Sequence, residues 1–425
     1  MFIKSKPLYS AITLKCIKDC IIFVQNNLIM KTISEVDFTG KKALIRVDFN
    51  VPLNDNCQVT DDTRIMAAVP TIKHILEKGG SVILMSHLGR PKDGPDAKFS
   101  LKHIVANLEK LIDQKVIFVH DCIGEASLEI TKNLKDGEVA LLENLRFYAE
   151  EKNGDSNFAK ELAKHGDIYI NDAFGTAHRA HASTSVIAEN FPNDKYFGLL
   201  LEKEILNIDA VLKEPQPPTT AIIGGAKVSS KISIIEKLLD TVDQIIIGGG
   251  MAYTFVKALG GKVGDSLVED DYIDTALKVL ELAKEKGVQI HLPTDTVVAD
   301  RFANDATSKS CGISKIEDGW MGLDIGTETI QQFNTVIQNS RTILWNGPMG
   351  VFEMENFKNG TVAIANALVN ATDAGAFTLI GGGDSVAAIN QLDLSDRVSY
   401  VSTGGGAMLE YLEGKELPGI KAILN

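Results

Sequence analysis

The strand-like apolar segments of this chain fall into two sets that end in different kinds of residue. Those of the first half end in charged or polar side chains, at residues 43–50, 82–90, 140–146 and 168–172. All but one of those in the second half end in glycine, at residues 221–225, 245–250, 379–383 and 400–406, with 343–347 as the exception. Ligands bind at the carboxyl ends of the strands in open parallel α/β sheets. We therefore expect two sites, one with side chains that suit a small anion and one with backbone amides that suit nucleotide phosphates.

Helical periodicity between these strands indicates the fold class. Apolar residues recur at helical spacing over 63–77, 101–112, 158–163 and 273–286, with Ser100 as an N-cap and Gly287 as a helix end. Strands that alternate with helices form parallel sheets with helices on both faces. A chain of 425 residues is expected to form two domains. The predicted fold is α/β, with two doubly wound parallel-sheet (Rossmann-like) domains joined by a hinge helix.

A long helix followed by prolines marks the expected domain boundary. Residues 200–212 have the pattern of one helix, and Pro215, Pro217 and Pro218 stop it. Residues 413–425 fit neither the helical nor the strand period, so we expect a packed tail. The predicted division is an N-terminal domain, a hinge, a C-terminal domain and a tail that packs back towards the N-terminal domain, at residues 30–200, 201–218, 219–410 and 411–425.

The segment before Met30 needs a separate interpretation. Its apolar stretch is broken by Lys15, Lys18 and Asp19, which leaves it too short for a signal-peptide core. We expect residues 1–29 to be an extension, dispensable or disordered, that arises from an upstream start codon. An organelle-targeting segment is the alternative.

Composition excludes several classes of partner. The net charge of −13 argues against nucleic acid. No run of about 18 apolar residues exists, so no membrane span is expected. Few and scattered cysteines favour a reducing, cytoplasmic location over a disulfide framework. Cys16 and Cys20 lack a second pair of ligands, so they do not predict a zinc site.

Basic side chains gather at the predicted strand and helix ends of the first half. Arginine matches the oxygens of carboxylates and phosphates with a planar, permanently charged fork. One such residue usually forms a surface salt bridge, but several strand ends of this kind indicate an anion site. The set is Arg46, Arg64, His87, Arg90, Arg146, His178, Arg179 and His181. Arg46 is its weakest member, since it lies four residues before the end of its strand and could instead pair with a helix.

The glycine-rich half contains an acidic residue and two lysines that suit a nucleotide. Asp384 follows three glycines and precedes a helical segment. A carboxylate there would repel phosphate unless a divalent cation such as Mg²⁺ lay between them; an ordinary N-cap is the alternative. Lys227 and Lys231 are four residues apart and would share one face of a helix. A bound polyphosphate would offset their repulsion, although they could also be two solvated lysines.

Several nucleotide-dependent classes lack their sequence signatures here. The chain has no G-x-x-x-x-G-K-[ST] motif and no H-R-D or D-F-G set, which excludes P-loop NTPases and protein kinases. No glycine cluster completes G-x-G-x-x-G/A, which weakens an NAD-linked dehydrogenase. A non-catalytic nucleotide-binding or scaffold protein remains an alternative, and nucleotide binding without turnover would identify it.

Seven motifs in order resemble those of the phosphoglycerate kinase family, from about Met30 to the C-terminus. Those of the first half are Arg46 to Pro52, Ser86 to Pro91, Glu143 to Phe147 and Ala177 to His181. Those of the second half are Gly224 to Lys231, Trp345 to Glu353 and Gly381 to Ser385. The resemblance implies reversible phosphoryl transfer between 1,3-bisphosphoglycerate and ADP, with Mg²⁺ as cofactor. No long apolar stripe in the sequence demands a partner, so a monomer is expected.

The resemblance also implies a role for each matching residue. The acid substrate would be held by Asp48, Phe49, Asn50, Arg64, His87, Leu88, Gly89, Arg90, Arg146 and Arg179, with His178 close by. The nucleotide would be held by Gly225, Ala226, Lys227, Lys231, Gly322, Glu353 on the ribose, Gly382, Gly383, Ser385 and Asp384, which would also hold Mg²⁺. The transferred group would lie among Arg64, Lys231, Gly382 and Gly405.

The implied reaction needs no catalytic base. Its nucleophile is a carboxylate, which has a pKa of about 3.5 to 4 and is already ionised at neutral pH. Catalysis would then consist mainly of positioning and of electrostatic stabilisation of the transferred group.

Overall fold

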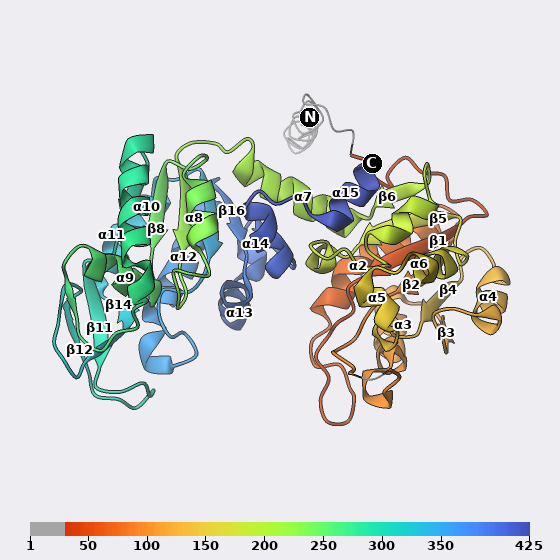
Figure 1. The fold of residues 1–425 in the computed structure, drawn as a ribbon, viewed down its shortest axis with the longest axis horizontal. Coiled ribbons are helices and arrows are strands. Elements are labelled where there is room, and N and C mark those ends of the chain that lie inside the picture. The colour runs from red at the N-terminus through yellow and green to blue at the C-terminus, as the bar shows by residue number, and fades with distance from the viewer. Residues whose placement is uncertain (1–29, 93) are drawn as a thin grey trace, which may run out of the picture.

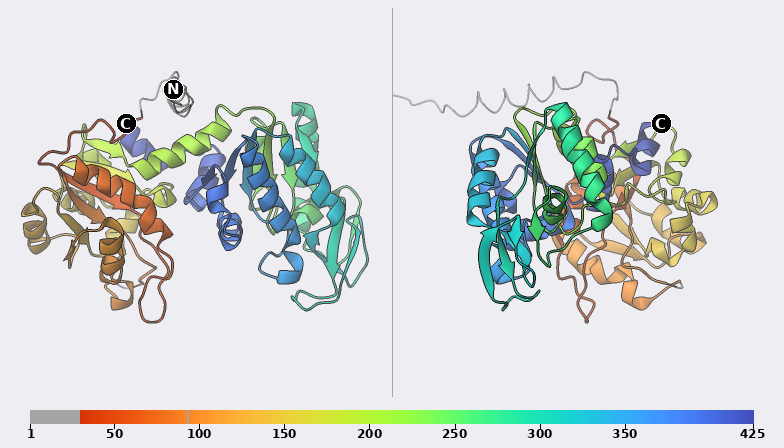
Figure 2. Two further views of the ribbon diagram at one scale, coloured as in Figure 1. Left: turned by 180° about the vertical axis from the view of Figure 1, so that it is seen from behind. Right: turned by 60° about the vertical axis from the view of Figure 1, so that its left-hand side comes forward.

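A computed structural model describes residues 30–92 and 94–425. The expected extension at residues 1–29 lies outside the described residues. Two lobes lie on either side of the helix α7 (Leu199–Leu212), which runs from one to the other (Figures 1 and 2). Each lobe is built on a parallel sheet of six strands, so the predicted α/β fold class is confirmed.

The first sheet has the strand order β3-β4-β2-β1-β5-β6, with every pair parallel. Because all strands are parallel, the loops after β1, β2, β4 and β5 share one edge, and the chain order reverses at β1. The strands are β1 (Lys42–Val47), β2 (Ser81–Met85), β3 (Val116–Val119), β4 (Val139–Leu142), β5 (Ile168–Asp172) and β6 (Lys195–Phe197). The helices of this lobe are α2 (Thr63–Glu77), α3 (Val105–Ile112), α4 (Glu125–Lys132), α5 (Ala149–Asn153) and α6 (Ser156–Ala163).

The second sheet has the order β10-β8-β7-β15-β16-β17, again with every pair parallel. Its strands are β7 (Thr219–Ile223), β8 (Gln244–Ile247), β10 (Gln289–His291), β15 (Thr342–Asn346), β16 (Phe377–Ile380) and β17 (Tyr400–Val401). Its helices are α8 (Ile232–Leu238), α9 (Met251–Ala258), α10 (Ile273–Lys286), α11 (Thr327–Gln338), α12 (Asn359–Asp373), α13 (Gly383–Gln391) and α14 (Gly406–Leu412).

Two small sheets extend the second lobe, and the sequence pattern did not predict them. An antiparallel sheet joins β11 (Asp295–Ala299) to β12 (Ser308–Gly312) and β14 (Met321–Ile325). A short parallel pair joins β9 (Lys262–Val263) to β13 (Lys315–Ile316). The strands of the antiparallel sheet mix polar and apolar residues, so they lack the continuous apolar run of a buried parallel strand.

Several helices begin and end where local chemistry places them. Asp155 caps α6 by accepting hydrogen bonds from the backbone N–H groups of Asn157 and Phe158. α10 ends at Gly287, which takes the left-handed conformation at φ 74°. The predicted bounds 63–77 and 273–286 are confirmed residue for residue.

Two sequence expectations about helices need correction. Residues 101–112 form a 3-10 turn, η2 (Leu101–Ile104), before α3, and the side chain of Ser100 caps that turn. The C-terminal segment forms the helix α15 (Pro418–Leu424), with proline at its first position. α15 lies against the first lobe, where the backbone N–H of Gly419 donates to Ala177 O at 2.8 Å. Because it is only 7 residues long, its pattern carries no readable period.

The apolar core continues from one lobe to the other through α7. Leu201, Ile205 and Ile208 of α7 are buried in a cluster that includes residues of both sheets. Burying one such side chain stabilises the fold by about 1.5–3 kcal/mol. The core therefore holds α7 against both lobes and fixes the edges at which the two sets of strands end.

Candidate active site

The loop after β1 and the start of α2 together form the first group of functional residues. Arg64, in the first turn of α2, donates from Nη1 to Asp48 Oδ2 at 3.1 Å and to Asn50 O at 3.2 Å. Its side chain is 40% exposed. No other nitrogen of this guanidinium has a partner among residues 30–92 and 94–425, so Arg64 can still bind an anion.

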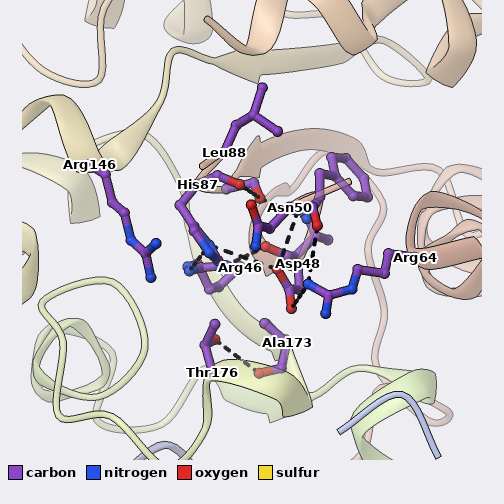
Figure 3. A network of polar contacts seen from close by, with 12 residues as sticks. Arg46, Asp48, Asn50, Arg64, His87, Leu88, Arg146, Ala173 and Thr176 are labelled. Carbon is purple, nitrogen blue, oxygen red and sulfur yellow. Dashed lines mark hydrogen bonds and ion pairs between the residues drawn. The ribbon is translucent and has the colours of Figure 1, made fainter. Parts of the chain in front are cut away.

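Hydrogen bonds between side chains and backbone groups join the loops after β1, β2 and β4. The parallel register places Arg46 of β1 beside Met85 of β2, and the following residues are then bonded to one another. Gly89 N donates to Asn50 Oδ1 at 2.8 Å, and Arg146 Nη1 donates to Gly89 O at 2.8 Å. Figure 3 shows Arg64 and Arg146 on opposite sides of the Asp48 and His87 pair.

Two polar side chains that sequence reasoning did not select hold this loop network in place. Ser86 Oγ accepts from Phe49 N at 2.8 Å. Asn144 accepts from Leu88 N at 3.3 Å and donates to Leu88 O at 2.8 Å. Both lie at strand ends inside the quoted motifs, which is the signal that could have identified them. Phe49 and Leu88 are themselves buried, so they contribute backbone rather than side-chain groups.

The electrostatics of this group favour an anion. Burial, followed by the positive charges of Arg46, Arg146 and Arg64, holds the pKa of His87 well below its usual value. Burial is also the main reason that the pKa of Arg146 is lowered. His87 is therefore neutral near pH 7. Its 3.8 Å approach to Asp48 is consequently not an ion pair.

The remaining predicted residues of the first lobe follow β2, in the case of Arg90, and β5, in the case of His178 and Arg179. Arg90 and Arg179 are exposed, and neither side chain has a hydrogen bond to any described residue. His178 is half-buried, and its Nδ1 is buried without a partner. Burial, then Arg179, lowers the pKa of His178. Its Nε2 would lie 3.9 Å from a Cβ at Gly406, so His178 faces the second lobe.

The loop after β7 begins the second group of residues. Gly225 and Ala226 leave the strand, and Lys227 and Lys231 precede α8 rather than lying on it. The expectation that the two lysines share a helix face is therefore wrong. The reason is a long-range contact, because Ser229 donates from N and Oγ to the carboxylate of Glu269 at 2.9 and 2.6 Å. This contact holds the segment as a loop.

Lys231 points across the edge of the second sheet. Its Nζ donates a short hydrogen bond to Asn346 Oδ1, and Asn346 donates in turn to Gly381 O at 3.0 Å. Burial lowers the pKa of Lys231, and the charge of Asp384 opposes that shift. The ends of β7, β15 and β16 thus meet around one ammonium group.

The loop after β16 becomes the N-terminus of α13. Gly382 is the N-cap, at φ 87°, a left-handed conformation that favours glycine, and the helix begins at Gly383. Asp384 therefore lies in the first turn, so the alternative that it is an N-cap is wrong. It is exposed, and its carboxylate has no hydrogen bond or ion pair with any residue that the structure describes. Ser385 is buried, and its Oγ accepts from Gly347 N at 2.5 Å.

Gly322 lies in β14 of the antiparallel sheet, Glu353 follows β15, and Gly405 lies near the first lobe. A Cβ at Gly322 would lie 1.9 Å from Tyr253 Oη, so a larger residue would not fit. Glu353 is exposed. Gly405 is the N-cap of α14. The adjacent Gly404 packs closely on Phe174, since a Cβ there would lie 2.3 Å from its ring.

The two groups are separate in this conformation. No hydrogen bond or ion pair among the described residues joins the residues around Asp48 to those around Lys231. The described residues also contain no cluster of three or more His, Cys, Asp or Glu side chains that could hold a metal ion. None of their helices is long and apolar enough to cross a membrane.

Known proteins similar to this chain share one description. A family model described as phosphoglycerate kinase matches residues 33–415. A phosphoglycerate kinase of Porphyromonas gingivalis is 53% identical over 416 residues, which covers 92% of this chain and 99% of the relative. A cytosolic phosphoglycerate kinase of Triticum aestivum is 54% identical over 392 residues, which covers 92% and 97%. The structure of phosphoglycerate kinase from Coxiella burnetii has a TM-score of 0.85 at 40% identity and covers 93% of this chain and 98% of that one.

Proposed function

Since the chain belongs to the phosphoglycerate kinase family, we propose that its two groups of residues are the two halves of one active site. The reaction of the family is the phosphoryl transfer of glycolysis between 1,3-bisphosphoglycerate and ADP, which gives 3-phosphoglycerate and ATP. The half on the first sheet holds the acid, and the half on the second sheet holds the nucleotide. One observation carries this assignment. Arginines and a neutral histidine gather at the carboxyl edge of one sheet, whereas a lysine and several glycines gather at that edge of the other.

The acid half fits a small phosphorylated carboxylate. Arg64 and Arg146 lie on opposite sides of the group (Figure 3), so they can take the two anionic ends of one molecule. Arg90 and Arg179 are exposed and can supply further charge. His178 belongs to the same half and faces the second lobe.

The nucleotide half presents Lys227 and Lys231 to phosphates, together with the backbone at Gly382 and the first turn of α13. Gly322 borders the nucleotide pocket, and Glu353 binds the ribose. Asp384 is the residue that would hold Mg²⁺. Its unpartnered, exposed carboxylate fits that ion, which proteins usually bind through one or two carboxylates plus substrate phosphates. When bound, Mg²⁺ neutralises charge on the phosphate oxygens.

The transfer itself is an in-line attack by the substrate carboxylate without a general base. The carboxylate is ionised near pH 7, and His87 and His181 have lowered pKa values that make them poor bases. The difficulty lies in bringing two anions together. Arg64, Lys231 and the backbone near Gly382 and Gly405 surround the transferred group and stabilise its charge.

The two halves meet by closure of the lobes as domains, with α7 as the hinge. The proposed division is 30–200 and 219–410, with 201–218 between them and 411–425 as the tail. Glu204 of α7 supports this, because its carboxylate accepts from Ser402 Oγ, Thr403 N and Thr403 Oγ1 at 2.7 Å each. These contacts connect α7 to the loop that carries Gly405. Closure excludes water and completes the site only when both substrates are bound.

We place the chain in the cytoplasm as a monomer. Relatives from Triticum aestivum and Arabidopsis thaliana are named as cytosolic, whereas those from Volvox carteri and Chlamydomonas reinhardtii are named as chloroplastic. Size-exclusion chromatography with light scattering measures the oligomeric state.

An omission assay tests the proposed function. ADP formation is measured with ATP, 3-phosphoglycerate and Mg²⁺, and each component is then left out in turn. The proposal expects turnover only when all three are present. Nucleotide binding without turnover, whatever acid is supplied, would show that the fold was interpreted correctly and the function was not.

A further inference from the structure

Arg46 is a buried cation that the proposed reaction does not use. Arg46 is 1% exposed, and its hydrogen bonds are all to residues of the first lobe. Nε donates to Ser183 Oγ at 2.8 Å, Nη1 donates a short hydrogen bond to Val47 O, and Nη2 contacts His87 Nδ1 at 3.2 Å. No carboxylate forms an ion pair with it among residues 30–92 and 94–425. Burying a charge this way is costly unless a counter-charge is near.

The counter-charge is reached through one hydroxyl. Ser183 donates from Oγ to Glu151 Oε1 at 2.6 Å and from N to Glu151 Oε2 at 3.0 Å. Glu151 belongs to α5 and is 1% exposed. Burial raises the pKa of Glu151, whereas Arg46 and the hydrogen bonds from Ser183 oppose that shift. Glu151 and Arg46 are thus connected through Ser183. Three elements far apart in sequence contribute one continuous chain of hydrogen bonds to the ring of His87.

This chain fixes the protonation of His87. An arginine can only donate, so Nδ1 of His87 must accept. The neutral ring then carries its proton on Nε2, which has no hydrogen bond to any residue that the structure describes. The other charged or titratable groups around the ring are Asp48, Arg64, Arg146 and His181. The three arginines and burial all disfavour a second proton on the ring.

We propose that Glu151 and Ser183 are positioning residues for the acid-binding half. Through Arg46 they hold His87 as an Nε2–H donor and present that proton to the anionic substrate. The identity of the anion rests on the proposed function, whereas the state of the ring does not. We call the hydrogen-bonded chain Glu151–Ser183–Arg46 the relay. Without it, the guanidinium of Arg46 is no longer held in place, and Nδ1 of His87 can carry the proton instead of Nε2.

Two variants test the relay against a matched control. Ser183→Ala removes the bridging hydroxyl. Glu151→Gln removes the charge and replaces one of the two oxygens that accept from Ser183 with a donor. The control is Thr131→Val in the same lobe, because Thr131 Oγ1 contacts His165 Nδ1 at 2.8 Å in a buried pair outside the site.

Nitrogen NMR of protein labelled with ¹⁵N-histidine gives the first measurement, and a His87→Gln sample identifies the signal. In the unaltered protein at neutral pH, His87 should show an unprotonated Nδ1 and a protonated Nε2. Both relay variants should show a mixture of tautomers. An unchanged tautomer in Ser183→Ala or in Glu151→Gln would overturn the proposal.

Steady-state kinetics give the second measurement. Both relay variants should raise KM for 3-phosphoglycerate about 10-fold, the cost of weakening one charge-assisted hydrogen bond. KM for ATP should stay within about twofold. An equal rise in KM for 3-phosphoglycerate in Thr131→Val would show that the effect comes from a general loss of packing, and would overturn the proposal. If 3-phosphoglycerate gives no turnover with the unaltered protein, the proposed function fails, and the NMR result still decides the relay.

Discussion

Arg64 lies at the open edge of the acid half, with one guanidinium nitrogen on Asp48 and Asn50. The other guanidinium nitrogens of Arg64 are the groups that we assign to the transferred phosphoryl group. Arg64→Ala should lower kcat by roughly 10²–10³-fold, as expected for loss of a donor to the transition state. The measurement is steady-state turnover at saturating substrates.

Arg397→Ala is the control for that variant, because Arg397 pairs with Asp373 at 2.7 Å on the surface. Exposed pairs of this kind contribute little, so its turnover should be normal. Near-normal turnover in Arg64→Ala would remove Arg64 from the transfer step.

Asp384 provides a second test with a single side chain. Its carboxylate has no hydrogen bond or ion pair within the described residues, so its neutralisation breaks none. Asp384→Asn should raise the Mg²⁺ concentration for half-maximal rate by about 10- to 100-fold. A Mg²⁺ titration at fixed ATP measures this, with Asp396→Asn, another exposed carboxylate, as the control. If the two variants respond alike, Asp384 is not the Mg²⁺ residue.

Sequence reasoning identified the charged residues of the site better than the residues that support them. The clustering of Arg64, His87 and Arg146 at strand ends was readable because parallel strands bring their carboxyl ends together. The relay from Glu151 through Ser183 was not readable, because it depends on a contact 32 residues apart in the chain. Arg46 is the weakest candidate of the basic set, and its burial agrees with a supporting position rather than a ligand-binding one.

The side chain of Asp172 binds the N-terminus of α7, the helix that joins the lobes. Its Oδ1 accepts from Leu200 N and Leu201 N at 2.9 and 3.1 Å, whereas Oδ2 is buried without a partner. Burial raises the pKa of Asp172 to about 6, from an ordinary 3.8. The folded state therefore binds the proton more tightly than the unfolded state. This contribution to stability is fully present below about pH 3.8 and is lost as the pH rises through 6.

Asp172→Asn keeps the accepting oxygen and removes the titration. The stability of the unaltered protein minus that of the variant should fall as pH rises from about 4 to 7, by at most about 1.4 kcal/mol per pH unit. Urea unfolding followed by circular dichroism measures it at several pH values. Asp167→Asn, at the exposed start of β5, controls for loss of a carboxylate. A pH-independent difference for Asp172→Asn would contradict the account.

Elements were predictable where local signals agreed. The bounds of α2 and α10 are predicted residue for residue because an apolar period coincides with a clear helix end. That end is the left-handed Gly287 after α10 and the Gly79-Gly80 pair after α2. The helical interpretation of Lys227 and Lys231 is wrong because the shape of this segment depends on Glu269, a residue distant in sequence. No local pattern contains such a contact.

The molecule as a whole consists of two half-sites on separate sheets, connected by α7. The order of strands and helices predicted both parallel sheets, because alternation restricts the topology strongly. It could not predict the antiparallel sheet of β11, β12 and β14, whose short polar strands follow no parallel-strand pattern. Nor could it set the separation of the halves, which depends on how α7 packs against both lobes.

Small-angle X-ray scattering tests the central claim, that two separate half-sites close into one. Profiles are compared for the protein alone, with 3-phosphoglycerate, with Mg²⁺ and a non-hydrolysable ATP analogue, and with all of these together. The account predicts the smallest radius of gyration when both substrates are bound, with little change for either alone. An identical radius in all four states, in a protein shown to turn over, would contradict closure.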